Sequence, residues 1–206
     1  YIFKGLSIEI KKGDSVGICG ETGSGKSSFL NLVLGFLSPT TGTIKIDGYD
    51  IHQNKMALKH VLGYVPQDIF LIDDSIANNV AFGELVGDLD RKRVRWALNE
   101  AQMEGFIIKQ KKGIDTHVGE RGVRLSGGQK QRLGIARALY FGANILVFDE
   151  ATSALDVATE RAVMHNIAKL KNKYTLIVVA HRLSTLKLCD QIYRLSKGGL
   201  VATELD

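Results

Sequence analysis

The sequence has little of what marks disordered, disulfide-stapled or membrane-spanning chains. It contains 2 prolines and 2 cysteines among 206 residues. Cys19 and Cys189 are isolated, which excludes a disulfide framework or a multi-thiolate zinc site and fits a reducing compartment. Low-complexity tracts and internal repeats are lacking, and no apolar stretch approaches the length needed to span a bilayer. These absences leave a globular domain with a proper core.

The composition and charge distribution argue against a nucleic-acid partner. The chain is 45% hydrophobic and 24% charged, which is ordinary for a globular protein. Its net charge is +5, but the basic residues are scattered, with the densest clusters at residues 91–95 and 109–112. Neither cluster interleaves aromatics for base stacking. We therefore expect no nucleic-acid partner.

The hydrophobic pattern predicts an α/β fold with a mainly parallel central sheet, because strands alternate with helices. The fully apolar strand at 145–148 indicates a sheet covered on both faces. Residues 67–130 have few strand signals and predict an inserted α-helical subdomain. Strands are expected at 6–10, 15–19, 43–47, 61–65, 145–148, 175–179, 192–195 and 200–203. Helices are expected at 26–35, 75–82, 91–101, 126–140 and 157–170.

A glycine-rich segment between the strand at 15–19 and the following helix fits G-x-x-x-x-G-K-[ST], the phosphate-binding P-loop. Its glycines let backbone N–H groups turn inward around an anion, and the helix N-terminus adds positive charge. Lys26 is expected to reach the β- and γ-phosphates, and the Ser27 hydroxyl to bind Mg²⁺. The predicted nucleotide-binding residues are Gly20, Glu21, Thr22, Gly23, Ser24, Gly25, Lys26, Ser27 and Ser28.

Two acidic residues close the apolar strand at 145–148. Ligands of open α/β sheets bind beyond the carboxyl ends of the strands, so Asp149 is expected to reach the Mg²⁺ held by Ser27. Glu150 is expected to point to the other side of the strand end and to polarise the water that attacks the γ-phosphate. An acidic cap on a strand would be the simpler reading of this pair without the P-loop.

A second anion site is predicted at the start of the helix at 126–140. Two glycines and a serine open that helix, so backbone N–H groups, the Ser126 hydroxyl and the helix dipole converge there. An ordinary serine N-cap is the alternative. The nucleotide-binding residues predicted here are Ser126, Gly127, Gly128 and Gln129.

The string Leu125-Ser126-Gly127-Gly128-Gln129 resembles the signature of the ATP-binding-cassette (ABC) family, and the resemblance covers the whole chain. It implies a P-loop NTPase (RecA-like) core over residues 1–206, with a small antiparallel β subdomain and the helical subdomain at about 67–130. ATP and Mg²⁺ are the implied cofactors.

The resemblance also implies roles for residues that would mean little alone. Gln67 is similar to the glutamine that senses Mg²⁺ and the attacking water, and residues 153–156 are similar to the segment that links two nucleotide sites. Asp156 reads more simply as a helix N-cap. His181 is similar to the switch histidine that holds the γ-phosphate. The implied catalytic residues are Glu150, His181, Gln67 and Lys26, and the implied metal ligands are Ser27, Gln67 and Asp149.

The family further implies partners. ABC domains work as head-to-tail pairs in which the signature of one copy caps the ATP of the other, so we expect a second copy of this chain. Residues 116–122 are similar to the exporter X-loop, which lies near the transmembrane domain. This implies a position on the cytoplasmic side of the inner membrane. Residues 69–76 and 189–195 look most like bacterial lipid-linked oligosaccharide flippases.

One departure from the family pattern concerns the N-terminus. Exporters stack an aromatic residue on adenine upstream of where this chain begins, and Tyr1 lies too close to the P-loop to match it. We therefore expect an N-terminally truncated fragment that holds ATP mainly by its phosphates, with lowered ATP affinity.

Other classes of ATPase share part of this pattern. A chromosome-maintenance or DNA-repair ATPase carries the same motifs, but it places a long coiled coil between P-loop and signature, where this chain has no sustained heptads. A translation factor would carry two such domains in tandem. A non-ABC P-loop ATPase would lack residues 125–129, and a pure binding module would have a degenerate site.

Overall fold

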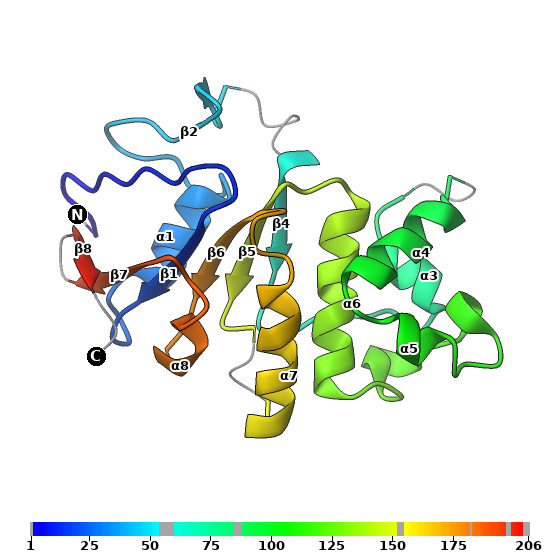
Figure 1. The fold of residues 1–206 in the computed structure, drawn as a ribbon. Helices are drawn as coiled ribbons and strands as arrows, with labels where there is room; N and C mark the ends of the chain where they lie inside the picture. The colour runs from blue at the N-terminus through cyan, green and yellow to red at the C-terminus, as the bar shows by residue number, and fades with distance from the viewer. Residues whose placement is uncertain are drawn as a thin grey trace.

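A mainly parallel sheet forms the centre of the molecule. The computed structural model describes residues 2–53, 60–84, 88–151, 155–181, 183–196 and 199–203. The sheet has the order β4-β5-β6-β1-β7-β8, and only the β7–β8 pair is antiparallel (Figure 1). The predicted α/β fold is confirmed. The strands are β1 (Ser15–Cys19), β4 (Leu62–Val65), β5 (Ile145–Asp149), β6 (Thr175–Val179), β7 (Gln191–Ser196) and β8 (Gly199–Thr203).

The helices gather around and beside this sheet. All five predicted helices are present, with ends that differ by at most two residues because terminal turns fray. The predicted helices are α1 (Lys26–Val33), α3 (Ile76–Val80), α4 (Arg91–Glu100), α6 (Gly127–Tyr140) and α7 (Val157–Ala168). The structure adds α5 (Glu104–Ile107), α8 (Leu183–Leu186) and the short 3₁₀ turns η1 (Gly113–Asp115) and η2 (Glu120–Gly122).

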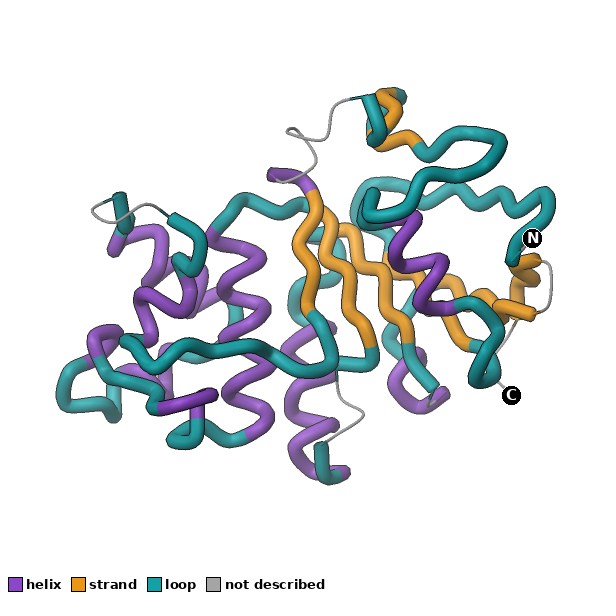
Figure 2. The backbone as a smooth tube through the Cα atoms, turned by 180° about the vertical axis from the view of Figure 1, so that it is seen from behind, coloured by secondary structure: helices purple, strands orange, loops and turns teal. Residues whose placement is uncertain are grey.

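Both faces of the sheet are covered, as the apolar strands require. Helix α1 packs on one face, where Phe29 meets Val147 and Ile177 in one apolar cluster. Leu146 and Phe148 belong to a second cluster, together with residues of α6 and α7. Figures 1 and 2 show α1 and α7 on opposite sides of the strands, and α3 to α6 beside the sheet. Alternate residues of β5 thus enter different clusters, so that neither face of the strand is left to water.

Two expected strands differ from the structure. Residues 6–10 are irregular, although Leu6, Ile8 and Ile10 are half-buried against the α1 cluster. The alternation of apolar and polar residues shows that one side of this segment is buried, and an extended chain can bury one side without pairing with a neighbouring strand. The strand expected at 43–47 shortens to β2 (Lys45–Ile46), which pairs antiparallel with β3 (Tyr49–Asp50) as a separate small sheet.

Some expectations lie outside the described residues. They concern Tyr1, and Ser153 and Ala154 of the segment expected to link two nucleotide sites. Among the described residues, none of the helices combines the length and apolar character that crossing a bilayer requires.

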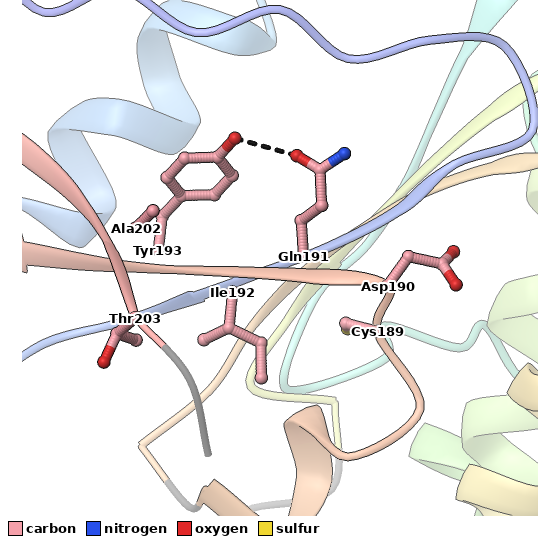
Figure 3. Close-up of a pocket in the computed structure, with 7 residues that line it drawn as sticks. All are labelled: Cys189, Asp190, Gln191, Ile192, Tyr193, Ala202 and Thr203. Carbon is pink, nitrogen blue, oxygen red and sulfur yellow. Dashed lines mark hydrogen bonds between the residues drawn. The ribbon is translucent and has the colours of Figure 1, made fainter.

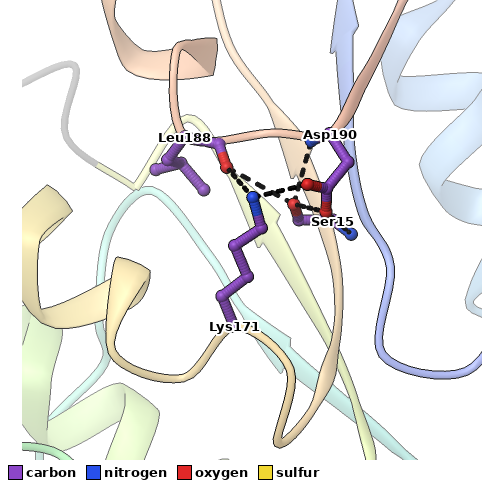
Figure 4. A network of polar contacts seen from close by, with 4 residues as sticks. All are labelled: Ser15, Lys171, Leu188 and Asp190. Atoms are coloured by element: carbon purple, nitrogen blue, oxygen red, sulfur yellow. Dashed lines mark hydrogen bonds and ion pairs between the residues drawn. The ribbon is translucent and has the colours of Figure 1, made fainter.

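Asp190 ties three segments together at the amino end of the sheet. Its Oδ2 accepts hydrogen bonds from the Ser15 hydroxyl at 2.6 Å and the Ser15 N–H at 3.1 Å, and its Oδ1 lies 2.6 Å from Lys171 Nζ (Figure 4). Lys171 also donates to the Leu188 carbonyl at 3.1 Å. Hydrogen bonds from Lys171 and then from Ser15 lower the pKa of the Asp190 carboxyl. The network joins the start of β1 to the turns that precede β6 and β7.

Replacing this carboxylate should weaken the fold in a pH-dependent way. Asp190→Asn is expected to lower the free energy of unfolding by on the order of 1 kcal/mol at pH 7, a modest value because the carboxylate is partly exposed to solvent. A lowered folded-state pKa stabilises above the unfolded pKa of about 4, and that stabilisation is lost as the pH falls through the folded pKa. Urea unfolding from pH 7 down to pH 3 checks this, with the exposed Glu9→Gln as control. If the difference in free energy of unfolding between Asp190→Asn and the unmodified protein does not become smaller at acid pH, the stabilising role of the Asp190 carboxylate is contradicted.

Candidate functional site

The glycine-rich loop leaves β1 and enters α1 through a tight turn. Gly23 and Gly25 have φ angles of 80° and 101°, which side-chain-bearing residues rarely adopt. A Cβ on Gly20 would lie 2.6 Å from the Ser24 hydroxyl and 2.6 Å from the Leu195 carbonyl. These positions therefore require glycine for backbone conformation or for space.

Lys26 bends back into its own loop. Its ammonium donates hydrogen bonds to the Gly20 carbonyl at 2.8 Å and the Glu21 carbonyl at 3.0 Å, and the residue is only 7% exposed. A buried ammonium held on two carbonyls makes the loop interior cationic. That charge suits a phosphate.

The remaining loop residues differ in accessibility. Ser27, at the start of α1, is exposed, which leaves its hydroxyl accessible to an oxygen-ligated cation. The Ser24 hydroxyl is buried and lacks a hydrogen-bond partner in the part of the chain that the structure describes. Exposed positions are Glu21, Thr22, Gly23 and Ser27, and half-buried ones are Gly20, Ser24, Gly25 and Ser28.

Strand register brings the predicted motifs to one edge of the sheet. Val179 of β6 lies level with Ile18 of β1 on one side and with Asp149 of β5 on the other. On the far side of β5, Phe148 lies level with Val65 of β4. Since these strands are parallel, the segments that follow them all leave from the same edge. The P-loop, Asp149, Glu150, His181 and Gln67 therefore all lie along that edge, which spans β1, β6, β5 and β4.

Asp149 and Glu150 turn to different neighbouring strands. Asp149 accepts a hydrogen bond from the Tyr64 hydroxyl of β4 at 2.9 Å. Glu150 has a φ of 48°, in the left-handed region, and its Oε1 lies 2.7 Å from His181 Nε2 after β6. Such a φ is uncommon for a residue with a side chain and occurs preferentially at functional sites. The two carboxylates thus point in different directions.

Tyr64 is a site neighbour that the sequence analysis missed. Its pKa is raised to about 12, mainly because burial disfavours the phenolate and further because the hydroxyl donates to the Asp149 carboxylate. The phenol therefore stays a hydrogen-bond donor at physiological pH. Tyr64 directly precedes Val65, the last residue of β4. Its position near the carboxyl end of a predicted strand was the one sequence signal that could have placed it at the site.

Gln67 begins the segment that follows β4. Its side chain is exposed, and its backbone carbonyl accepts a hydrogen bond from Gln131 Nε2 of α6 at 2.6 Å. Gln131 was also missed. A signal existed, because Gln131 stands four residues before Ile135, which the periodicity places on the apolar side of that helix, and a buried amide needs a partner.

The signature segment (residues 126–129) forms the N-terminus of α6. Ser126 and Gln129 close a reciprocal capping box, with the Ser126 N–H donating to Gln129 Oε1 at 2.8 Å. A Cβ on Gly127 would lie 2.5 Å from Leu155, and one on Gly128 2.8 Å from Thr159. The glycines therefore let the start of α6 approach the start of α7. Ser126 and Gly127 remain exposed.

Asp156 caps helix α7, which is the simpler of its two readings. Its Oδ1 accepts hydrogen bonds from the Ala158 N–H at 3.1 Å and the Thr159 N–H at 3.0 Å. Hydrogen bonds with Thr159 are the leading reason that the pKa of Asp156 is lowered. The cap leaves Leu155 against Gly127, so that the two helix starts are in contact.

An open pocket lies away from this edge. It is formed around β7 and β8, where Figure 3 shows Gln191 and Tyr193 on one side of the strand and Ile192 on the other. None of the predicted site residues lines it. Burial raises the pKa of the Cys189 thiol to about 12, so this cysteine is not a ready nucleophile. The pocket is lined by Cys189, Asp190, Gln191, Ile192, Tyr193, Ala202 and Thr203.

Comparison with known proteins agrees with this geometry. The family model described as ABC transporter matches residues 3–153. An ATP-dependent lipid A-core flippase of Burkholderia orbicola is 44% identical over 95% of this chain and 33% of its own length. An ATM1-type heavy metal exporter of Novosphingobium aromaticivorans is 44% identical over 97% of this chain and 33% of its own length. The structure of a bacterial Atm1-family ABC exporter with ATP bound has 43% identity and a TM-score of 0.82, covering 97% of this chain and 35% of that one.

The chain belongs to the ABC transporter family, and it is a nucleotide-binding ATPase domain of the exporter type. It spans about a third of the length of the relatives it matches.

Lys26 provides a direct test of the loop. Lys26→Met is expected to weaken ATP binding at least tenfold, on the order of 1.4 kcal/mol, because the loop loses the ammonium that lies in it. Isothermal titration with ATP and Mg²⁺ checks this. Lys45→Met, on the exposed strand β2, is the matched control and should bind as the unmodified chain does. Unchanged affinity in Lys26→Met would show that the phosphates lie elsewhere.

Proposed function

We propose that this chain hydrolyses ATP as the motor domain of a membrane exporter or flippase. The observation that carries the proposal is the Glu150–His181 contact of 2.7 Å at the sheet edge that also holds the Lys26 loop. A carboxylate and an imidazole beside a cationic phosphate loop are the parts that activation of water at a phosphoryl group requires.

Each residue at this edge has a task in the proposed reaction. The amides of residues 20–27 and the Lys26 ammonium hold the β- and γ-phosphates and stabilise charge on the transferred group. Glu150 orients the attacking water and takes its proton as the new P–O bond forms in line with the leaving ADP oxygen. His181, which already bonds Glu150, donates to the γ-phosphate from the end of β6. Gln67 approaches from the end of β4 and completes the site.

The same edge fits Mg²⁺. Ser27 supplies an exposed hydroxyl and Asp149 a carboxylate, the hard oxygen donors that this ion prefers. Within the described ranges no group of three or more His, Cys, Asp or Glu side chains forms a metal cluster. A site with few protein ligands suits Mg²⁺, which keeps waters and phosphate oxygens in its shell. When bound, the ion would neutralise charge on the β- and γ-phosphates.

The signature segment supports a composite site made by two copies. Ser126 and Gly127 are exposed at the start of the 14-residue helix α6, whose dipole favours an anion. Throughout the described part of the chain, no hydrogen bond or ion pair joins this segment to the P-loop. We propose that it contacts the ATP of a second copy in a head-to-tail homodimer. ATP then stabilises the pair, and hydrolysis releases it.

A second exposed surface supports a membrane-domain partner. Phe70 and Phe82 are 62% and 42% exposed and pack edge-to-face with ring centroids 6.0 Å apart. The Arg137 guanidinium lies 5.2 Å from the Phe82 ring centroid. An aromatic pair beside a cation is a favourable docking spot. We propose that the transmembrane domain of the same transporter docks there, next to the predicted X-loop, on the cytoplasmic side of the inner membrane.

The cargo is a separate matter from the motor. The relatives named above carry names that specify lipid A-core in one case and heavy metals in another. Both match this chain at 44% identity. Because this ATPase domain is equally similar to two relatives whose names specify different substrates, we infer that the substrate is selected by parts of those proteins outside the region that this chain matches. Flipping of a lipid-linked substrate follows the resemblance at residues 69–76 and 189–195.

A non-transport ABC ATPase is the alternative function. Chromosome-maintenance ATPases need a long coiled coil between P-loop and signature. In the described residues between Ser27 and Leu125, the longest helix after α1 is α4, with 10 residues. That length favours the transporter proposal.

Glu150→Gln separates binding from hydrolysis. The amide keeps the size of the side chain but cannot take a proton, so kcat should fall by on the order of 100-fold or more while ATP still binds. Steady-state ATPase assays and ATP titrations measure the two effects. Gel filtration with ATP should show a larger dimeric fraction, because the ligand that joins the copies persists.

The control for that variant is Glu104→Gln, an exposed residue of α5. It should hydrolyse ATP at the rate of the unmodified protein. Full turnover in Glu150→Gln would remove Glu150 from its assigned role.

A further inference from the structure

One face of helix α6 holds the segment that begins with Gln67. Gln131 donates to the Gln67 carbonyl at 2.6 Å. Three residues further along the helix, Gly134 lets Ile69 pack so closely that an added Cβ would lie 2.5 Å from it. Another three residues on, Arg137 donates to the Phe70 carbonyl at 3.0 Å. Residues three apart share a helix face, so successive turns of α6 contact residues 67–70 through two hydrogen bonds and one close packing contact.

The contact at Gln131 is the one nearest the signature segment. Gln131 is 6% exposed, and its Oε1 has no hydrogen-bond partner within the described part of the chain. Such an unsatisfied amide oxygen costs free energy when buried. An apolar side chain of similar size would avoid that cost. A glutamine at this position is therefore poorly explained by stability alone.

The helix makes the signature segment and Gln131 one rigid unit. Ser126 caps α6 and Gln131 lies within its first two turns. The capping box fixes the start of the helix, so a displacement of the signature segment displaces Gln131 with it. Since Gln131 holds the Gln67 carbonyl, the Gln67 side chain, which is exposed, moves too.

We propose that Gln131 is a positioning residue that sets Gln67 according to where the signature segment lies. The inference rests on the proposed function, in which Gln67 serves the nucleotide of its own chain and the signature segment serves that of a second copy. Gln131 thereby links the occupancy of one composite site to the geometry of the other. It touches neither nucleotide.

A double-mutant cycle tests whether Gln131 acts through Gln67. Gln131→Leu is expected to lower kcat about tenfold, an effect of about 1.4 kcal/mol that matches one lost hydrogen bond to a positioned group. In a Gln67→Ala background, the same substitution should lower kcat less than about twofold, because the side chain that it positions is gone. Each kcat is calculated per ATP-binding site, so that a smaller fraction of folded protein in a variant does not lower its kcat.

The matched control is Gln110→Leu. Gln110 also donates its side-chain amide to a backbone carbonyl, that of Phe106 at 3.3 Å, but it lies apart from the Gln67 segment. It should leave kcat unchanged in both backgrounds. A tenfold fall for Gln131→Leu in both backgrounds, or a fall no larger than that of Gln110→Leu, overturns the proposal.

A second variant covers the case in which Gln131→Leu does not fold. In Gln131→Glu, the protonated carboxyl can still donate to the Gln67 carbonyl, whereas the ionised form repels it. Burial raises a carboxyl pKa above its usual value of about 4.3. ATPase activity relative to the unmodified protein should therefore be highest at the acid end of pH 5.5–8.5 and fall as the pH rises. Activity equal to the unmodified protein throughout that range overturns the proposal.

Failure of the broader function would look different. An unmodified protein that hydrolyses no ATP above the level of Glu150→Gln would overturn the proposed function and, with it, this inference. A protein that depends on Glu150 but shows additive effects at Gln131 and Gln67 would overturn this inference alone.

Discussion

The level register of the parallel strands is the constraint on which the site depends. Ile18, Val179 and Asp149 lie in one row across β1, β6 and β5, so the three chain segments that follow emerge side by side. These strands are buried on both faces, and slippage by one residue would turn their side chains to the wrong cluster. Packing of the core therefore fixes the relative positions of polar groups that lie outside it. The Glu150–His181 contact is a direct result of that register.

Helix α6 performs a similar task for the helical side of the molecule. It packs against β4, and it also carries the signature segment at one end and the Gln67 segment on one face. The sheet fixes the phosphate loop and the acidic pair, whereas α6 fixes the parts that approach from outside the sheet. The segment that begins with Gln67 lies where these two sets of elements meet, after β4 of the sheet and against α6.

Much of the fold and the site could be predicted from the sequence, because the signals are local. Apolar runs predicted β1, β5 and β6, and the P-loop glycines predicted a turn that the φ angles of Gly23 and Gly25 confirm. The side-chain contacts that the sequence did not predict at the site are long-range. Pairing of Tyr64 with Asp149 spans 85 positions and that of Gln131 with Gln67 spans 64. Hydrogen bonds between side chains of distant elements leave no periodic pattern in the sequence. The pattern at residues 6–10 likewise could not show that this segment has no strand to pair with.

The close approach of α6 and α7 bears on how variants of the signature glycines are read. Gly127 and Gly128 leave no room for a Cβ, because Leu155 and Thr159 occupy that space. A substitution at either glycine thus pushes apart two helices that start from different motifs. Any loss of turnover would combine a change at the signature with a change at the start of α7. Such variants report on the contact between motifs within one chain as much as on the contact between two chains.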